Sequence, residues 1–484
     1  MLKNKKVVSS LFLFLVYNLV AAQSTFTLLI SDSANNYPGD IIELSDHTFI
    51  LSSEFYTSSP NQASQRFFKI NAHGLVTHDS IFENQNGTST LLKLVYINDT
   101  NIFCIGDWAN LGEKDQKWIA AIDSGFNLHW NKKYQINYDY AKTSAAFLNS
   151  QGKIISSATA TNDNYRNFLF FQEYSLTGDM INSSIDSSAT SPVIFDMMEF
   201  PGSGMYRAAV SAYVTYSMGQ LLTVDSALKI VGVDSIPDGV YWYNSLKKIN
   251  DSDFYLSGNI HPNQSYDYAV MLLNEHNDCK KIDVIGQNDT IDYAGITKSM
   301  DCITPDTIFL GGTSNVELPY GHYGNQDSWY ALSNFDSVLN IRWTKYYGGD
   351  AYYLLESVVA TNDGGAILVG TRYDYSTQSD ICGIYLVKVN GNGVLTFDDH
   401  NQLPLVHDAI VYPNPGSDYL IIESGSQISG AQFIITTIDG KQIVSKTLDI
   451  GKITIPTQFL QSGTYVWQVI FNDRIIETGK WIKN

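Results

Sequence analysis

The sequence contains few cysteines, the residues that cross-link small secreted folds, and few prolines. Of its 484 residues only 4 are cysteine and 12 are proline, and 16% are charged. Cys104, Cys279, Cys302 and Cys382 show no Cys-x-x-Cys spacing, which argues against a zinc site or a disulfide scaffold. We expect Cys104, in an apolar run, to be an inert buried residue, and the sequence leaves a bridge between Cys279 and Cys302 open.

Short motifs for common catalytic and metal chemistry are also missing. The 9 histidines form no His-Glu-x-x-His spacing, and there is no Gly-x-Ser-x-Gly elbow or phosphate-binding loop. We expect His73 and His78 to flank a hairpin. The sequence therefore predicts no catalytic residues, no metal and no cofactor. Four acids that stand beside loops are interpreted as turn formers: Asp107, Asp267, Asp327 and Asp380.

Long apolar runs are scarce as well. Residues 7–20 form the one apolar run that could be considered as a membrane span. This run is shorter than the roughly 20 residues that are needed to cross a bilayer. Lys3, Lys5 and Lys6 precede this run and Ala21-Ala22 follows it, a pattern typical of a signal peptide over residues 1–22. We expect a mature chain without a transmembrane segment.

The charge of the chain is strongly negative, with 30 basic and 49 acidic residues and a formal net charge of -19. Acidic and basic residues balance within 410–484, so the excess negative charge precedes this segment. Phosphate groups would be repelled, which argues against nucleic acid as a partner.

A repeated pattern fills the chain between residue 23 and about residue 403. Each copy holds four strand-like segments and a turn headed by a small polar residue, and copies recur about every 50 residues without helical periodicity. This pattern predicts a seven-bladed β-propeller over residues 23–403, in which 26–30 completes the last blade. The predicted turns begin at Asn71, Asp123, Ser175, Asp225, Asn274, Asp336 and Asn390.

The end of the chain has a different pattern, because strand-like runs at 419–423, 431–438, 441–448, 464–471 and 474–482 follow a turn-forming Pro-Asn-Pro. Short turns at Asp439-Gly440 and Asn472-Asp473 join them. We therefore expect a small C-terminal β-sandwich domain, with a linker from residue 404, and an all-β chain overall.

This arrangement resembles the C-terminal sorting domain of proteins exported by the type IX secretion system of Bacteroidetes. The resemblance runs through 412–415, Leu420 and Ile422, 439–441, 460–465 and 480–483. It implies a partner in the outer-membrane secretion machinery and a location outside the cell or on its surface. The repeated region likewise resembles propellers that often precede such domains, and a monomer is expected. Seven residues carry the sorting motif: Tyr412, Pro413, Asn414, Pro415, Gly440, Gly463 and Tyr465.

Aromatic residues gather in the loops between the second and third strands of each predicted blade. In a propeller these loops share one face, where aromatic rings would suit a bound glycan or protein. The alternative is that these rings fold back over the sheets. We predict a non-catalytic binding or adhesion protein. The alternative, a polysaccharide hydrolase or lyase, would need two or three carboxylates that converge on the propeller axis. The predicted ligand-binding residues are Tyr56, Trp108, Tyr165, Tyr320, Tyr323 and Tyr373.

Overall fold

The computed structural model describes most of the chain from residue 24 onward. The described residues are 24–31, 35–57, 62–82, 87–110, 113–136, 138, 140–162, 164–186, 192–200, 204–214, 216–235, 240–260, 266–287, 290–318, 321–377, 381–395, 409–412, 415–424, 430–437, 440–449, 451–471 and 474–484. Within them, strands are joined by turns and one short 3-10 helix, η2 (Tyr375–Thr377). The prediction of an all-β chain is confirmed. The predicted signal peptide lies outside the described residues.

The strands before residue 390 form seven antiparallel sheets, which we call sheets 1 to 7. Sheet 1 contains β2 (Asn35–Glu43), β3 (Phe49–Thr57), β4 (Gln62–Ile70) and β5 (Val76–Phe82). Sheet 2 contains β6 (Gly87–Asn98), β7 (Asn101–Asn110), β8 (Gln116–Ile122) and β9 (Leu128–Gln135). Sheet 3 contains β10 (Tyr140–Leu148), β11 (Ile154–Thr161), β12 (Asn167–Tyr174) and β13 (Met180–Asp186). Sheet 4 contains β14 (Pro192–Phe200), β15 (Met205–Val214), β16 (Tyr216–Val224) and β17 (Ile230–Ser235).

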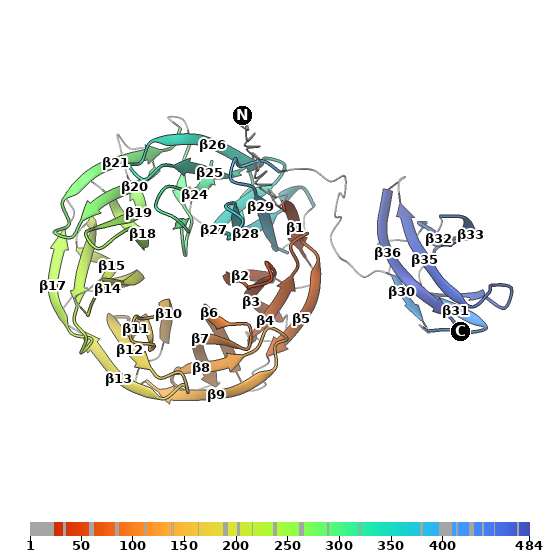
Figure 1. Ribbon diagram of the computed structural model, residues 1–484, viewed down its shortest axis with the longest axis horizontal. Helices are drawn as coiled ribbons and strands as arrows, with labels where there is room; N and C mark the ends of the chain where they lie inside the picture. Colours follow the sequence, from red (N-terminus) through yellow and green to blue (C-terminus); the bar gives the residue numbers. More distant parts are fainter. Residues whose placement is uncertain are drawn as a thin grey trace, which may run out of the picture.

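Sheet 5 contains β18 (Val240–Lys248), β19 (Asp253–Ile260), β20 (Asp267–Asn274) and β21 (Cys279–Ile285). Sheet 6 contains β22 (Tyr293–Ala294), β23 (Met300–Cys302), β24 (Ile308–Ser314), β25 (Trp329–Phe335) and β26 (Ile341–Gly348). Sheet 7 contains β27 (Tyr352–Ala360), β28 (Ala366–Tyr373), β29 (Gly383–Val389) and β1 (Phe26–Ile30). Each sheet contacts the next one along the chain, and sheet 7 contacts sheet 1, so the sheets surround a central axis in a propeller-like arrangement (Figure 1).

Burial follows the position of a strand within its sheet. The middle strands are buried along almost their whole length, as in β11 and β12 of sheet 3. The outer strands, such as β13 and β9, alternate between exposed and partly buried residues. The middle strands are covered on both faces by the neighbouring sheets, which explains why apolar and small residues dominate their sequences without strict alternation.

The first strand of the chain joins the last sheet. β1 pairs antiparallel with β29, with Phe26 opposite Lys388 and Ile30 opposite Ile384. Leu28 is buried in a cluster that unites residues of sheets 1 and 7. The predicted pairing of residues 26–30 with the final sheet is confirmed.

Seven equivalent turns follow the third strands of the seven sheets. In each, the side-chain oxygen of the first residue accepts the backbone N–H groups two and four residues later; Asp225, for example, accepts from Ala227 at 2.9 Å and Lys229 at 2.8 Å. The fourth residue has a positive φ, as at Gly178 (76°) and Leu228 (62°). All seven predicted turn positions are confirmed by this shared hydrogen-bond pattern. As predicted, His73 lies in the first of these turns and His78 in the strand after it.

The strands from residue 409 onward form two further sheets. One contains β30 (Ala409–Tyr412), β31 (Tyr419–Ser424) and β34 (Gly451–Pro456). The other contains β33 (Gln442–Thr447), β32 (Gln432–Thr437), β35 (Gly463–Phe471) and β36 (Arg474–Lys483). Sequence reasoning missed β30 and β34, because β30 ends where the predicted turn begins and β34 has alternating polar residues.

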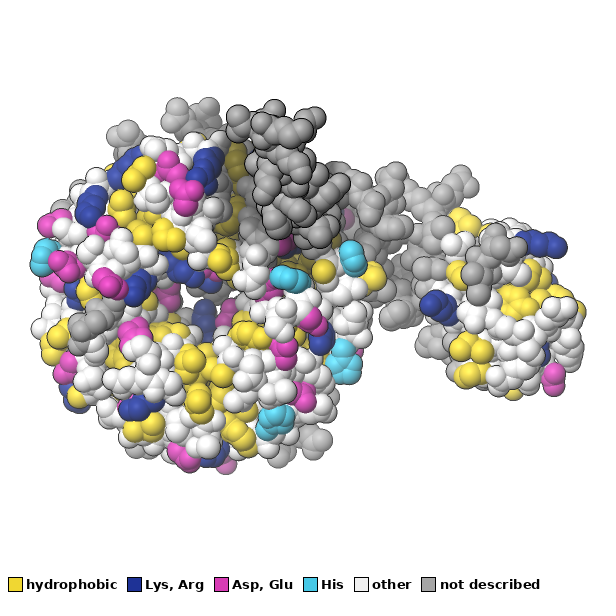
Figure 2. Space-filling model, viewed as in Figure 1, with side chains coloured by type: hydrophobic (Ala, Val, Ile, Leu, Met, Phe, Trp, Pro, Cys, Tyr) yellow, Lys and Arg dark blue, Asp and Glu magenta, His cyan; other side chains and the backbone are white. Residues whose placement is uncertain are grey.

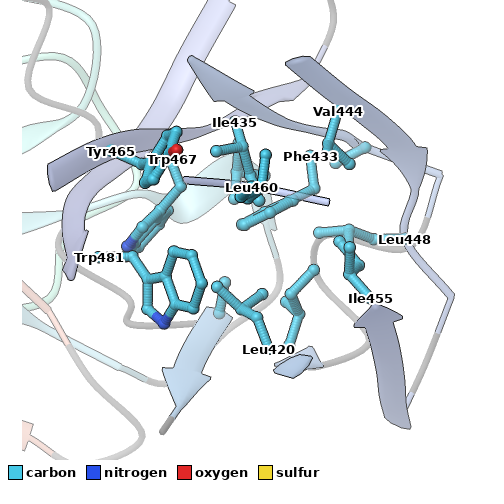
Figure 3. Packing of buried hydrophobic residues seen from close by; sticks show 14 residues of the cluster. Leu420, Phe433, Ile435, Val444, Leu448, Ile455, Leu460, Tyr465, Trp467 and Trp481 are labelled. Atoms are coloured by element: carbon cyan, nitrogen blue, oxygen red, sulfur yellow. The ribbon is translucent and has the colours of Figure 1, made fainter. Parts of the chain in front are cut away.

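Both of these sheets contribute to one apolar core (Figure 3). Leu420 and Ile455 project from the first sheet, and Phe433 from the second. Phe433 stacks on Trp467 with ring centroids 5.8 Å apart, and Trp481 is fully buried. The C-terminal strands therefore have a core of their own, as a domain requires.

One sequence interpretation needs correction, and one alternative that the sequence left open is decided. Asp107 is not a turn former, because it lies in the middle of β7, where it is buried and forms an ion pair with Lys117. The four cysteines are free, so the bridge between Cys279 and Cys302 that the sequence left open is not formed. Cys104 is buried, as predicted.

Candidate functional site

The strands nearest the axis carry a β-bulge in most of the sheets. The pairing register shifts at 143–145 in β10, 194–196 in β14 and 355–357 in β27, with similar shifts in β2, β6 and β18. A bulge inserts a residue that the neighbouring strand does not match, and it thereby redirects side chains. Ser144, Phe195 and Glu356 are such inserted residues, and all three line a cavity at the axis.

Side chains from one sheet hold the bulged strand of the next. Asp40 accepts the backbone N–H of Leu94 at 2.9 Å, and Asp196 accepts that of Leu246 at 2.8 Å. These carboxylates satisfy backbone groups that the irregular strands leave unpaired. The walls of the cavity are therefore fixed by contacts between sheets.

The cavity has a volume of about 600 Å³, within the range of small-molecule sites. Residues of sheets 1, 2, 3, 4, 6 and 7 line it. Figure 2 shows the ring hollowed at its centre, with both basic and acidic side chains at the edge of the hollow. The polar lining residues are Tyr37, Glu54, Lys93, Lys142, Thr143, Ser144, Thr159, Thr161, Asn167, Thr297, His322 and Glu356.

Glu356 and His322 face each other in this cavity. The Oε1 atom of Glu356 lies 3.8 Å from Nε2 of His322. Burial raises the pKa of Glu356 to about 8, although the positive charge of Lys142 opposes the rise. Burial also lowers the pKa of His322 to about 4, and Lys142 lowers it further. Both side chains are therefore mainly uncharged at neutral pH.

Three aromatic side chains meet beside His322. The hydroxyl groups of Tyr37 and Tyr323 are 2.9 Å apart, and the ring of Tyr323 packs edge-on against that of Tyr373 at 5.0 Å. The ring of Tyr37 lies 4.5 Å from the His322 imidazole. Because Tyr37 and His322 line the cavity, this group, which we call the tyrosine cluster (Tyr37, Tyr323 and Tyr373), borders it.

The structure brings two of the predicted ligand-binding residues together, Tyr323 and Tyr373, and separates Trp108. The Trp108 ring packs 5.9 Å from that of Trp118, and the Lys133 ammonium lies 3.2 Å from its centre. The Trp108 ring therefore folds back over its own sheet, which was the alternative to a ligand-binding role. Tyr165 is 89% exposed in the β11–β12 turn, close in sequence to the lining residues Thr161 and Asn167.

The remaining predicted positions are described only in part. Tyr56 lies in β3, where its backbone is paired with that of Asn35 in β2. The side chain of Tyr56 and the whole of Tyr320 lie outside the described residues. Of the acids interpreted as turn formers, Asp327 accepts the Tyr375 hydroxyl at 2.6 Å, and Asp380 lies outside the described residues.

Sequence reasoning missed Glu356, Lys93 and Lys142. A signal was present for Glu356 and Lys93, since each is an ionisable residue inside an apolar run of a strand that lies next to the axis. Lys142 is followed by Thr and Ser and gives no such signal. An ionisable side chain buried like Glu356 is costly to keep charged unless it is paired and hydrogen-bonded.

The sorting-motif residues occupy the turns and core of the C-terminal sheets. Gly440 has a φ of 85° and donates its N–H to Thr437 at 2.9 Å, closing the turn between β32 and β33. Tyr465 is buried beside Trp481 and donates its hydroxyl to the Gln461 carbonyl at 2.8 Å. Gly463 begins β35 and Pro415 is exposed, while Pro413, Asn414 and the side chain of Tyr412 lie outside the described residues.

In the part of the chain that the structure describes, no group of three or more histidine, cysteine or acidic side chains is placed to hold a metal ion. Nor does any described helix have the length and apolar character needed to cross a membrane.

Comparison with known proteins identifies the C-terminal part. Residues 410–484 match the family model of the secretion system C-terminal sorting domain. This part of the chain is a type IX secretion sorting domain. It implies interaction with the secretion machinery and secretion to the cell surface or the extracellular space.

No curated protein matches the chain. Among solved structures, the β-propeller domain of the Trilobed protease from Pyrococcus furiosus is similar at 8% identity and a TM-score of 0.45, over 77% of this chain and 100% of that one. PorZ, a surface component of the type IX secretion system of Porphyromonas gingivalis, has 10% identity and a TM-score of 0.41, over 92% of this chain and 59% of that one. A protein of unknown function from Bacteroides caccae has 11% identity and a TM-score of 0.39, over 61% of this chain and 93% of that one.

Proposed function

We propose that the chain is a secreted, non-catalytic carbohydrate-binding protein that holds a glycan in the axial cavity. In this proposal sheets 1 to 7 are the blades of a seven-bladed β-propeller over residues 23–403, and the C-terminal sheets form a β-sandwich that directs export. The observation that carries it is the cavity itself, which combines an aromatic border with a polar lining.

The chemistry of the lining suits a sugar. Thr143, Thr159, Thr161 and Asn167 supply uncharged hydrogen-bonding groups from one sector of the wall, sheet 3. The tyrosine cluster borders the cavity on the side of sheets 1, 6 and 7. Sugars present hydroxyl groups at their edges and apolar C–H faces, and aromatic rings bury such faces at low entropic cost.

The test is a glycan binding screen with the secreted protein and a variant that carries Tyr323→Ala and Tyr373→Ala. We expect binding by the wild type and a loss of at least about tenfold in affinity in the variant. Tyr346→Ala is the matched control, because Tyr346 is an exposed tyrosine on the outer strand β26. A screen in which proteins bind and glycans do not would contradict the proposal.

A second candidate function, glycoside hydrolysis, is favoured by one observation. Glu54 and Glu356 both line the cavity, and the raised pKa of Glu356 is typical of a general acid. Two carboxylates meet the minimum for hydrolysis, but the aromatic border and the uncharged hydrogen-bonding groups of sheet 3 make binding the preferred function. Release of reducing sugar ends from a bound polysaccharide, abolished by Glu356→Gln, would establish hydrolysis instead.

A further inference from the structure

We infer that the ligand of the axial cavity is an anionic sugar, whose negative group is bound by Lys93 and Lys142. This inference rests on the proposed carbohydrate-binding function and specifies the class of sugar. Lys93 comes from β6 of sheet 2 and Lys142 from β10 of sheet 3, so the two ammonium groups enter the cavity from neighbouring sheets.

The two lysines differ from four other lysines of the sheets in having no hydrogen-bond or ion-pair partner among the described residues, although Glu356 and Asp196 are close enough to interact with them electrostatically. Lys117 is paired with Asp107 and donates to Thr143 at 2.6 Å. Lys247 and Lys298 share Asp301, at 2.6 and 2.9 Å. Lys388 binds Asp363 at 2.9 Å. Within the part of the chain that the structure describes, neither Lys93 nor Lys142 forms such a hydrogen bond or ion pair, although both line the cavity.

The nearby carboxylates do not remove the positive charge. Glu356 is mainly protonated at neutral pH. Asp40 and Asp196 are not among the residues that line the cavity, and they accept backbone N–H groups of their own and of neighbouring strands. Glu54 is the one further acid among the described lining residues. Among the described residues that line the cavity, two ammonium groups therefore face Glu54 and the mainly protonated Glu356.

A positive recess is unusual in a chain whose formal net charge is -19. A recess lined by low-dielectric walls strengthens the attraction between the ammonium groups and a bound anion. An ammonium group is a point charge without a preferred planar partner, so it accepts a carboxylate or a sulfate group. Uronic acid residues and sulfated sugars carry these two groups, and both remain open as the source of the anion.

The experiment compares matched oligosaccharides by isothermal titration calorimetry with the whole secreted protein. The probes are a neutral glucose oligomer, a glucuronate-containing oligomer of the same length and its sulfated counterpart. We expect at least one anionic oligomer to bind about tenfold more tightly than the neutral one, and more weakly as salt rises. Whichever of the two anionic oligomers binds more tightly identifies the anionic group of the ligand as a carboxylate or a sulfate.

Variants complete the test. Lys93→Gln and Lys142→Gln should each weaken binding of the anionic oligomer about tenfold, and weaken binding of the neutral oligomer much less, and Lys142→Arg should retain binding of the anionic oligomer. The control is Lys132→Gln, which removes the same charge from the outer strand β9, where Lys132 pairs with Asp179. Thermal unfolding of every variant shows that it is folded.

Two results would overturn the inference, and they differ. Equal binding of neutral and anionic oligomers, unaffected by the glutamine variants, refutes the anionic ligand while the carbohydrate-binding function stands. If no oligosaccharide binds in this or the wider glycan screen, the proposed function fails and the inference fails with it.

Discussion

Glu356 of β27 and His322 of the β24–β25 loop lie 3.8 Å apart without forming an ion pair at neutral pH. Burial holds the carboxyl protonated, with a pKa of about 8, and the imidazole neutral, with a pKa of about 4. A buried pair in which both partners are neutral avoids the cost of desolvating two charges. It also makes the stability of the ring depend on pH in a defined direction.

Glu356 should destabilise the protein as pH rises. Its carboxyl keeps its proton in the folded state at pH values where the unfolded chain has lost it, so the free energy of unfolding falls between roughly pH 5 and 8, by at most about 1.4 kcal/mol per pH unit. Glu356→Gln cannot ionise, so the variant should gain stability relative to the wild type over this interval. Urea denaturation at pH 6, 7 and 8 measures the difference. Glu275→Gln, at an exposed acid, should show no such trend.

The Lys117–Asp107 pair should be sensitive to loss of one partner. Both side chains are almost completely buried between sheets 2 and 3, and Lys117 also donates to Thr143. Asp107→Asn leaves a buried ammonium group without a countercharge, which should cost about 3–5 kcal/mol. The exposed Lys132–Asp179 pair offers the comparison, and Asp179→Asn should cost less than about 1 kcal/mol. Equal losses in urea denaturation would show that burial does not govern these pairs.

The turn positions were predictable from sequence because their chemistry is local. A side-chain oxygen that caps the N–H groups two and four residues later requires only one residue of the right type, and Asp123, Asp225 and Asp336 supply it within five residues of chain. The pairing of β1 with β29 is not local, and it was predictable for a different reason: a ring with an unpaired edge would expose a strand.

The site was much less predictable because it is assembled from strands far apart in the chain. Glu356 reaches the cavity through a bulge in β27, and it meets Lys142 and His322 only when sheets 3, 6 and 7 surround one axis. The sequence shows that an aromatic residue such as Trp108 is near a loop, but it does not show where the ring points. In the folded protein the contact with Trp118 sets the direction of the Trp108 ring. Sequence reasoning therefore located the loops of one face and missed the charged residues of the channel.

Ring closure should depend on the apolar side of β1. Leu28 is 3% exposed within the cluster that joins sheets 1 and 7, so Leu28→Ala should lower the free energy of unfolding by about 2–5 kcal/mol. Ile181, on the outer strand β13, is 49% exposed, and Ile181→Ala should change stability by less than about 0.5 kcal/mol. A similar small effect at both positions would mean that β1 contributes little to closing the ring.

One turn should tolerate no side chain at its fourth position. Gly178 has a φ of 76°, and a Cβ atom there would lie 2.3 Å from the Trp130 ring of sheet 2. Gly152 has a φ of 73° with no neighbouring atom within 4 Å, so Gly152→Ala carries the backbone strain alone, about 1–2 kcal/mol. Gly178→Ala should cost about 1–3 kcal/mol more than this control, because the Trp130 ring must move. Equal destabilisation of the two variants in thermal unfolding would show that the Trp130 side chain moves aside at little cost.

The sorting domain should act as a separable export signal, because its core is contained within its own two sheets. Attaching residues 404–484 to a periplasmic reporter should carry the reporter across the outer membrane of a bacterium with a type IX secretion system, and removing residues 410–484 should retain the protein in the periplasm.

Trp481→Ala removes a fully buried ring from β36 and should cost about 3–5 kcal/mol, enough to abolish export of the reporter. Lys446→Ala, on the exposed side of β33, is the control and should leave export unchanged. Immunoblots of cell fractions decide the outcome, and secretion of the Trp481→Ala reporter at the level of the control would mean that recognition does not require the folded core.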